Sequence, residues 1–452
     1  MATDIDNVLL SQCAHIDLTP FSLYVHVPFC QVRCGYCDFN TYTKGFGVGA
    51  EPSSYHLSVI REIDHVTSLL NLYGPKDWLS QGIHTLYFGG GTPTLLPTDA
   101  MRKIIRHVDT CLGVAADAEI STEANPDTLT PQSIQALADM GCTRVSVGMQ
   151  SAVPHVLATL DRIHDPLSVQ RVVEWVHEAG MDVSLDIIYG TPGESMQDWQ
   201  TTVDTAIEMQ PDHISAYSLV IEQGTKMGAQ LKRGIIAEPD SDDLADKYAY
   251  VDAALSRAGY RWYEISNWAR ICDDEHETAE VDATQLRHAC RHNVAYWRNW
   301  NWWGCGPGAH SHIGQMRAWN VKHPHAYAQR LTGHCQPVVA GRPEAVGTQC
   351  DRMVKAEAYG RQDALCHVPL AIDNYEIVDE KASILEEVML KIRMADGLQI
   401  EPGKAESIIK RLVKEEMIDP YAVNNNNIRL TLRGRLMADY VTLLLVEALA
   451  LQ

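Results

Sequence analysis

The sequence lacks any uninterrupted apolar run of about 18 residues, the length that a helix needs to cross a bilayer. Its most apolar segment, residues 441–452, is too short for this and predicts a terminal core helix. The N-terminal residues also lack the basic segment, apolar stretch and small-residue cleavage site of a secretory signal. We therefore expect a cytoplasmic protein that touches membranes only transiently.

Basic residues are few, because Lys and Arg total 37 against 58 Asp and Glu, which gives a formal charge of −21. A surface this acidic repels the phosphates of nucleic acids and anionic lipid headgroups. The charge balance therefore argues against nucleic acid as a partner.

Apolar, β-branched segments of strand length recur with amphipathic helical patterns between them, at residues 22–28, 83–90, 118–125, 144–150, 183–190 and 213–220. This alternation predicts parallel βαβ units with right-handed crossovers. Six strands are too few for a closed eight-stranded barrel. We therefore predict an α/β fold built on an open, partial (β/α)6 barrel.

A chain of 452 residues exceeds the size at which one hydrophobic core stops growing. We predict an N-terminal extension at 1–20, the barrel at 21–260, a connecting region at 261–377, and a mainly α-helical, winged-helix-like domain at 378–452. Residues 271–290 and 335–377 lack periodicity and are expected to be irregular surface loops. In an acidic protein, a winged-helix-like domain serves packing or partner docking more often than DNA binding.

Cysteine is too dilute for a disulfide scaffold, with 12 residues in the chain, so clustered cysteines indicate metal or redox chemistry. Cys30, Cys34 and Cys37 form such a cluster, with C-x3-C-x2-C spacing. A four-iron cluster bound fully by protein needs four thiolates, so three leave one iron open to another ligand. The alternative is a structural zinc site with His26 as fourth ligand, although closed zinc sites often use two C-x2-C pairs.

Glycines and polar residues gather near the ends of the predicted strands. Gly89–Thr92 follow the second strand, Glu123 lies near the end of the third, Gln150 ends the fourth, and Asp186 lies in the fifth. Each alone could be a turn, a helix cap or an ion pair. Parallel α/β folds carry their chemistry at this edge, so together they predict a ligand site.

The cysteine motif, with Gly-Gly-Gly-Thr after the next strand, resembles the radical S-adenosylmethionine (SAM) superfamily. The resemblance implies a [4Fe–4S] cluster whose open iron binds the amino and carboxylate groups of SAM, and cleavage of SAM to a 5′-deoxyadenosyl radical. It narrows to the coproporphyrinogen-oxidase-like branch through residues 24–39, 88–94, 122–128, 147–151, 160–164 and 185–194. By this resemblance the SAM site comprises Tyr24 and Tyr36 beside the cluster, Gly90, Gly91 and Thr92 at the methionine end, and Glu123, Gln150, Arg162 and Asp186 lining the pocket.

Phe39 separates the two functional classes of this branch. Oxygen-independent coproporphyrinogen III oxidases carry a further cysteine at this position, two residues after the third, whereas haem chaperones of the HemW type resemble the present sequence. The resemblance implies a chaperone that delivers haem to haem-requiring proteins, such as respiratory enzymes at the membrane. The cluster and SAM would then regulate dimerisation, reduction or transfer. The alternative is an oxidase that abstracts hydrogen from propionate side chains and decarboxylates them to vinyl groups.

The second mark of the HemW type is the motif H-N-x-x-Y-W at residues 292–297. A neutral imidazole is a good ligand for haem iron, and aromatic faces give a flat macrocycle apolar contact. Four tryptophans and one tyrosine lie within residues 296–303, and a packed aromatic core is the competing explanation for them. The candidate haem residues are His292, Asn293, Tyr296 and Trp297, with Cys290, His310 and His312 as alternative ligands.

Overall fold

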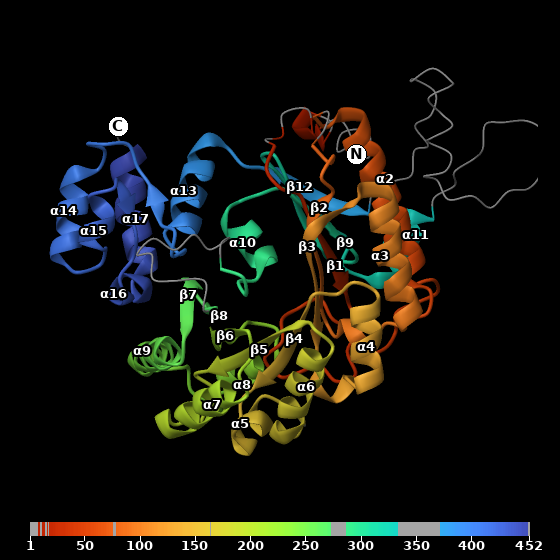
Figure 1. The fold of residues 1–452 in the computed structure, drawn as a ribbon, viewed down its shortest axis with the longest axis horizontal. Helices are drawn as coiled ribbons and strands as arrows, with labels where there is room; N and C mark the ends of the chain where they lie inside the picture. The colour runs from red at the N-terminus through yellow and green to blue at the C-terminus, as the bar shows by residue number, and fades with distance from the viewer. Residues whose placement is uncertain are drawn as a thin grey trace, which may run out of the picture. The chain divides into compact units, whose positions relative to one another are not determined.

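The computed structural model describes residues 8–9, 11–13, 16, 18–75, 78–162, 164–272, 286–332 and 371–450 (Figure 1). Much of the predicted N-terminal extension and of the predicted loops at 271–290 and 335–377 lies outside these residues. The chain divides into two compact units, each assembled from three segments. Among the helices in the described residues, none combines the length and hydropathy that a bilayer span requires.

The first unit comprises residues 1–31, 40–120 and 301–377. Its strands follow the order β12-β11-β10-β9-β1-β2, in which β1 runs parallel to both β2 and β9, and the pairs from β9 to β12 are antiparallel. Its elements are β1 (Ser22–Val27), α2 (Tyr55–Tyr73), β2 (Ile83–Gly90), α3 (Thr98–Leu112), β9 (Trp302–Cys305), β10 (His310–Ile313), β11 (Met316–Asn320), α11 (Pro324–Leu331) and β12 (Ile372–Ile377).

The second unit comprises residues 32–39, 121–300 and 378–452, and the chain enters it within β3 (Val114–Ala124). Strands β3 to β6 are parallel, and β8 and β7 extend the row antiparallel. The elements up to residue 300 are α4 (Pro131–Asp139), β4 (Arg144–Gln150), α5 (Pro154–Thr159), α6 (Pro166–Glu178), β5 (Asp182–Tyr189), α7 (Met196–Glu208), β6 (His213–Ser218), α8 (Lys226–Lys232), α9 (Ser241–Arg257), β7 (Tyr260–Glu264), β8 (Asn267–Arg270) and α10 (Arg291–Trp297).

The C-terminal part of the second unit is mainly helical and has a hydrophobic core of its own (Figure 1). A two-stranded sheet joins its helices. Its elements are α13 (Glu380–Lys391), β13 (Leu398–Gln399), α14 (Glu406–Lys414), α15 (Pro420–Val423), β14 (Asn427–Ile428), α16 (Leu432–Leu436) and α17 (Ala438–Ala450). The predicted order of two helices, a turn with a short strand and a last helix is present.

The predicted strands are confirmed as β1 to β6, and the mixed α/β fold with a parallel core is confirmed with them. Residues 372–377 were expected to be irregular and instead form β12, which pairs with β11. Strand β12 is exposed along most of its length, so its sequence carries little of the apolar alternation from which strands are predicted.

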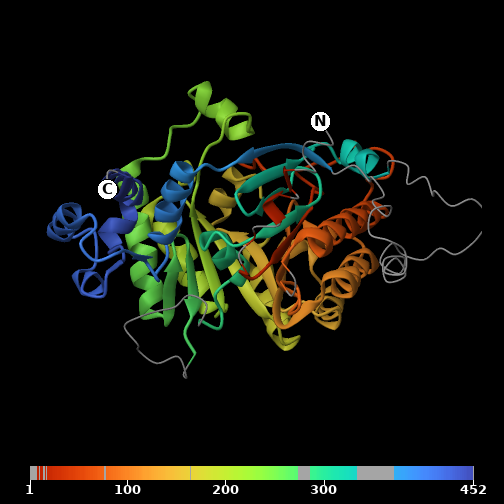
Figure 2. The same ribbon diagram turned by 90° about the horizontal axis from the view of Figure 1, so that it is seen from above.

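Helix α6 illustrates how the sequence positions the layers of the second unit. The Asp165 side chain accepts a hydrogen bond from the Leu167 N–H and caps the helix, and Pro166 occupies its first turn. Gly180 ends it in the left-handed region at φ 76°. Its buried residues recur at three- and four-residue spacing. Helix α6 consequently packs on β4 and β5, and α7 packs beside it on β5 (Figures 1 and 2).

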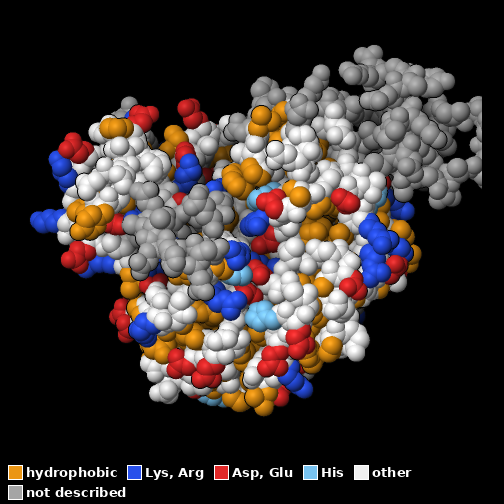
Figure 3. Space-filling view, viewed as in Figure 1, with side chains coloured by type: hydrophobic (Ala, Val, Ile, Leu, Met, Phe, Trp, Pro, Cys, Tyr) orange, Lys and Arg blue, Asp and Glu red, His pale blue; other side chains and the backbone are white. Residues whose placement is uncertain are grey.

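Acidic and basic side chains are interspersed over the face of the molecule drawn in Figure 3. The excess of 58 acidic over 37 basic residues is therefore not gathered into a single acidic field on that face.

A buried carboxylate on α2 holds the elements on one side of β1 together. The Glu62 carboxylate accepts hydrogen bonds from the N–H of Gly306 at 2.9 Å, the amide of Asn320 at 2.8 Å and the hydroxyl of Tyr327 at 2.5 Å. Two turns earlier, the Tyr55 hydroxyl donates to the carbonyl of His26 in β1. Helix α2 thus anchors the strand that leads to Cys30.

The first prediction concerns the protonation of Glu62, because burial raises the pKa of this carboxyl to about 7. The folded state then binds the proton more tightly than the unfolded chain, so the free energy of unfolding falls as pH rises from about 4.5 to 7. Glu62→Gln should remove this pH dependence. It should also lower stability by about 1–3 kcal/mol, because its amide nitrogen would face N–H donors.

Urea unfolding between pH 5 and 8 measures both effects. The exposed Glu238→Gln is the control and should keep the wild-type slope. A Glu62→Gln variant with an unchanged slope would show that Glu62 is already ionised at pH 5.

Candidate functional site

Backbone hydrogen bonds fix Cys30 at the point where the chain leaves β1. Its N–H donates to the carbonyl of Tyr42 at 3.0 Å, and the N–H of Tyr42 donates to the carbonyl of Pro28 at 2.7 Å. Cys30 belongs to the first unit, whereas Cys34 and Cys37 belong to the second. All three are half-buried thiols.

The glycine segment after β2 lies against the same end of β1. The N–H of Gly91 donates to the Val27 carbonyl at 2.8 Å, and the N–H of Thr92 donates to the Phe29 carbonyl at 2.7 Å. A Cβ at Gly91 would lie 2.5 Å from the Phe29 carbonyl oxygen, so no larger residue fits. Gly90 adopts φ 111°, a backbone conformation that side-chain-bearing residues rarely adopt. The glycines therefore have a structural role whether or not they contact SAM.

Tyr24 is oriented by a histidine two residues later in β1. His26 Nε2 lies 3.0 Å from the carbonyl oxygen of Asn40, which can only accept, and His26 Nδ1 lies 3.0 Å from the Tyr24 hydroxyl. Burial lowers the pKa of His26, so the ring is neutral, carries its proton on Nε2 and accepts from Tyr24. His26 is thus occupied by two hydrogen bonds, which weakens the alternative in which it is a zinc ligand.

Gly35 positions the loop with Cys34 and Cys37 within the second unit, through a backbone hydrogen bond and close packing. The N–H of Met227 donates to the Gly35 carbonyl at 2.9 Å. A Cβ at Gly35 would lie 2.6 Å from the Asp161 carboxylate, which pairs with Lys226 Nζ at 2.7 Å. A side chain at position 35 would therefore collide with this ion pair.

Arg162 connects the cysteine loop to the end of β3. Its guanidinium donates to the amide oxygen of Asn125 at 2.6 Å and to the hydroxyl of Tyr36 at 3.3 Å. Burial raises the pKa of Tyr36, the charge of Arg162 lowers it, and Cys34 and Cys37 nearby raise it. The phenol therefore stays neutral next to the cysteines.

The remaining residues assigned to SAM lie on neighbouring strands of the second unit. Glu123 of β3 is in register with Ser146 of β4, whose hydroxyl donates to the Asp186 carboxylate of β5 at 3.0 Å. Burial raises the pKa of Asp186, and hydrogen bonds from Ser215 and Ser146 and the charge of Arg162 partly oppose this. One face of β3 to β6 thus carries a row of carboxyl and hydroxyl groups.

Gln150 turns back over its own strand. It adopts the left-handed conformation at φ 62°, which is unusual for a residue other than glycine. A Cβ built on Gly148 would lie 2.6 Å from Gln150 Nε2 and 3.7 Å from Arg162 Nη2. The Gln150 amide and the Arg162 guanidinium therefore converge above Gly148, which is in register with Asp186.

A prediction follows for Arg162, which holds Tyr36 and Asn125 together. We expect Arg162→Gln to weaken SAM binding about 10- to 100-fold, because a charged hydrogen bond contributes about 1.5–3 kcal/mol and 1.4 kcal/mol is a factor of ten. Anaerobic titration calorimetry with SAM measures the dissociation constant. The matched control is Arg171→Gln on the exposed face of α6, which should leave it unchanged. Equal affinities for the two variants would remove Arg162 from the site.

The H-N-x-x-Y-W motif forms helix α10. His292 is buried, with 1% exposed, and its Nε2 lies 2.9 Å from the Tyr296 hydroxyl one turn later. Burial raises the pKa of Tyr296, and Cys290 and Glu123 raise it further. The motif is thus built next to Glu123, a residue assigned to SAM. Asn293 is half-buried.

Trp297 is held by a buried carboxyl. Burial raises the pKa of Glu264 to about 7, and hydrogen bonds from the Ser266 N–H and the Trp297 indole partly oppose this. The ring packs on a small apolar cluster with Tyr263 and Val294. Trp297 is therefore a half-buried residue whose ring packs against this core cluster.

The dense aromatic segment 296–303 is divided between the two units. Tyr296 and Trp297 belong to α10 in the second unit, whereas Trp302 and Trp303 lie in β9 of the first. Trp303 is buried, and its indole donates to Glu62 at 3.4 Å. The other four aromatic side chains of the segment are half-buried, so the packed-core explanation holds fully only for Trp303.

The alternative haem ligands differ in their exposure to solvent. Cys290 and His312 are buried, and burial lowers the pKa of His312 to about 4, while His312 Nε2 lies 2.7 Å from the Gly314 carbonyl. His310 is exposed, with its ring stacked on Trp319. Phe39, which marks the branch, is 58% exposed.

Sequence reasoning missed residues that support the site, chiefly Gly35, Asn125, Ser146 and Glu264. Gly35 lies inside the cysteine motif, and Asn125 lies two residues after Glu123, so both stood within segments already singled out. Ser146 carried no local signal, because its role arises from pairing between strands. The role of Glu264 arises from its contact with Trp297 of α10.

Comparison with known proteins places these features in a family. The model of the radical SAM superfamily matches residues 24–206. The chain is 39% identical over 424 residues to the haem chaperone HemW of Mycobacterium tuberculosis, covering 93% of this chain and 94% of the relative. It is 33% identical to HemW of Escherichia coli, covering 70% and 77%. The coproporphyrinogen III oxidase HemN of E. coli shares the fold, with a TM-score of 0.71, 20% identity, and coverage of 97% and 93%.

Proposed function

Because the chain belongs to the HemW family of haem chaperones, within the radical SAM superfamily, we propose that it binds haem and delivers it to haem-requiring proteins. Respiratory enzymes at the membrane are the proposed acceptors, and a homodimer is the proposed form that the cluster and SAM regulate. The observation that carries the proposal is α10, whose His292 and Tyr296 form a hydrogen-bonded pair next to Glu123.

Membership of the superfamily brings a [4Fe–4S] cluster and SAM as cofactors. We propose Cys30, Cys34 and Cys37 as the cluster ligands. The donor set fits, because half-buried thiols are the ligands that iron–sulfur clusters use, and three of them leave one iron for an exogenous group. The cluster supplies an iron site that chelates SAM, and Tyr36 remains a neutral phenol beside it.

For SAM, we propose two sets of polar groups. Tyr24 and the segment Gly90–Thr92 supply a hydroxyl and backbone groups at the end of β1. The second set comprises Glu123, Gln150 and Asp186 on β3 to β5 and Arg162 in the turn that follows α5. A carboxylate suits ribose hydroxyls or an ammonium group, and a guanidinium suits a carboxylate.

For haem, we propose His292 as the axial ligand, with Asn293, Tyr296 and Trp297 around it. The Nε2 atom of His292 is engaged by the Tyr296 hydroxyl, so ligation through that atom requires this hydrogen bond to open. Haem binding would therefore reorganise α10, and its proximity to Glu123 offers a route by which SAM affects that step.

The test is a paired assay on one anaerobically reconstituted sample. Hemin titration should show saturable binding near one haem per chain, and incubation with reductant, SAM and coproporphyrinogen should yield no protoporphyrinogen. Clear protoporphyrinogen formation would make the protein an oxidase despite Phe39. Absence of saturable hemin binding would overturn the chaperone function.

A further inference from the structure

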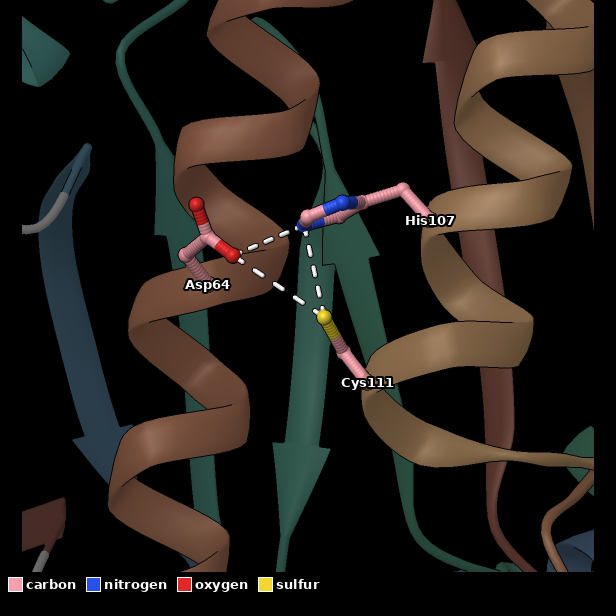
Figure 4. A group of neighbouring side chains, drawn as sticks. All are labelled: Asp64, His107 and Cys111. Carbon is pink, nitrogen blue, oxygen red and sulfur yellow. Dashed lines mark hydrogen bonds and ion pairs between the residues drawn. The ribbon is translucent and has the colours of Figure 1, made fainter. Parts of the chain in front are cut away.

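Three side chains of metal-binding type, none of them from the cysteine motif, meet between two helices of the first unit (Figure 4). Asp64 comes from α2, and His107 and Cys111 come from α3, where a spacing of four residues places them on the same face. His107 Nε2 lies 2.7 Å from Asp64 Oδ1 and 3.5 Å from Cys111 Sγ, and Sγ lies 4.0 Å from Oδ1.

The geometry does not suit a cysteine nucleophile. A Cys–His–Asp relay needs the imidazole to contact the thiol through one nitrogen and the carboxylate through the other. Here the same Nε2 atom faces both Asp64 and Cys111. Three ligand atoms directed at one point are instead the arrangement of a metal site (Figure 4).

The three atoms are close enough together to share one small divalent ion. The point equidistant from them lies in their plane, about 2.0 Å from each, whereas tetrahedral zinc has bonds of roughly 2.0 Å to nitrogen and oxygen and 2.3 Å to sulfur. Zinc binding would therefore lengthen the 2.7 Å separation between His107 Nε2 and Asp64 Oδ1 as the ion replaces their hydrogen bond. One thiolate, one imidazole and one carboxylate are all zinc ligands. The side chains of His107 and Asp64 are 9% and 10% exposed, so solvent reaches the site and can supply a fourth ligand.

A second group of carboxylate and imidazole side chains differs from this one in the charges that surround it. Asp182, Asp212 and His288 also lie together, but Arg144 pairs with Asp182 at 3.0 Å and Arg270 pairs with Asp212. Guanidinium groups already balance those carboxylates. That group is therefore an ion-pair network at the start of the parallel strands.

We propose that Asp64, His107 and Cys111 bind one Zn²⁺ ion, with water as the fourth ligand. Binding deprotonates the Cys111 thiol and releases its proton to solvent, so affinity rises with pH. The ion cross-links α2 to α3. Asp64 lies two residues after Glu62, which accepts hydrogen bonds from Gly306, Asn320 and Tyr327, so the ion would stiffen the support of β1.

The test uses the full chain with its iron–sulfur cluster reconstituted. Zinc K-edge X-ray absorption distinguishes zinc from iron, and chelator competition gives the affinity. We expect one zinc per chain with one sulfur at about 2.3 Å and nitrogen or oxygen ligands at about 2.0 Å. Cys111→Ser should lose the sulfur signal, and both Cys111→Ser and His107→Ala should bind zinc at least a hundredfold more weakly. Cys272→Ser, another half-buried cysteine, is the control and should bind normally.

Three results would overturn the site. One is no zinc at equimolar concentration, and another is zinc binding unchanged in Cys111→Ser. The third is a spectrum with two or more sulfur ligands, which would place zinc at the cysteine motif. Circular dichroism separates loss of the ligand from loss of the fold in each variant.

Discussion

Replacing any one of Cys30, Cys34 or Cys37 by alanine is expected to abolish the iron–sulfur cluster. Three thiolates are the fewest that hold a four-iron cluster with one open iron, so the loss of one leaves two irons without protein ligands. Iron and acid-labile sulfide after anaerobic reconstitution should fall from about four of each per chain to near zero. The SAM-dependent change in the electron paramagnetic resonance signal should disappear with them.

The control for this series is Cys272→Ala, which removes a half-buried thiol outside the motif and should leave iron and sulfide unchanged. Retention of a full cluster in Cys34→Ala would assign that ligand to another residue. Near-zero iron in the wild type would instead favour a scaffold that has kept the fold without the cluster.

His292→Ala is expected to weaken hemin binding at least tenfold and to shift the haem absorption maximum, because an axial imidazole is lost. A buried histidine also packs, and its removal leaves the Tyr296 hydroxyl without the partner that His292 provides. A lower hemin affinity alone would therefore not distinguish loss of the axial ligand from loss of the fold. The absorption maximum reports the ligand directly.

Tyr296→Phe is the matched variant for this experiment. It removes the hydroxyl that engages His292 Nε2 but keeps the aromatic ring. If His292 is the ligand, Tyr296→Phe should bind hemin at least as tightly as the wild type with an unchanged spectrum. Equal losses in the two variants would point to a structural pair and move attention to the exposed His310.

The parallel strands were predictable because each is a buried apolar run ended by glycine, proline or a polar residue. Strand β1 alternates fully buried Leu23, Val25 and Val27 with other residues, and β4 is buried throughout. Strands β9 to β11 have only four or five residues each, rich in Trp, His and Gly. Strands this short show too few alternations for a local periodicity, so their sequence indicates aromatic clustering instead.

The sequence likewise predicts one part of the candidate site and leaves another part unpredicted. Residue types at strand ends pointed to Glu123, Gln150 and Asp186, since parallel strands bring their carboxyl ends to one edge. Sequence spacing carries no information on the backbone turn that folds Gln150 over Gly148, or on the contact between Arg162 and Asn125. Both depend on loop conformation, which is set by packing across the unit.

The pairing of β1 has a consequence for the timing of assembly on the ribosome. Strand β1 lies between β2 and β9, and β9 starts at Trp302, far along the chain. At roughly 5–20 residues per second, β1 keeps an open edge for tens of seconds while the rest is translated. The sheet around the strand that presents Cys30 is therefore completed only after Trp302–Cys305 has left the ribosome.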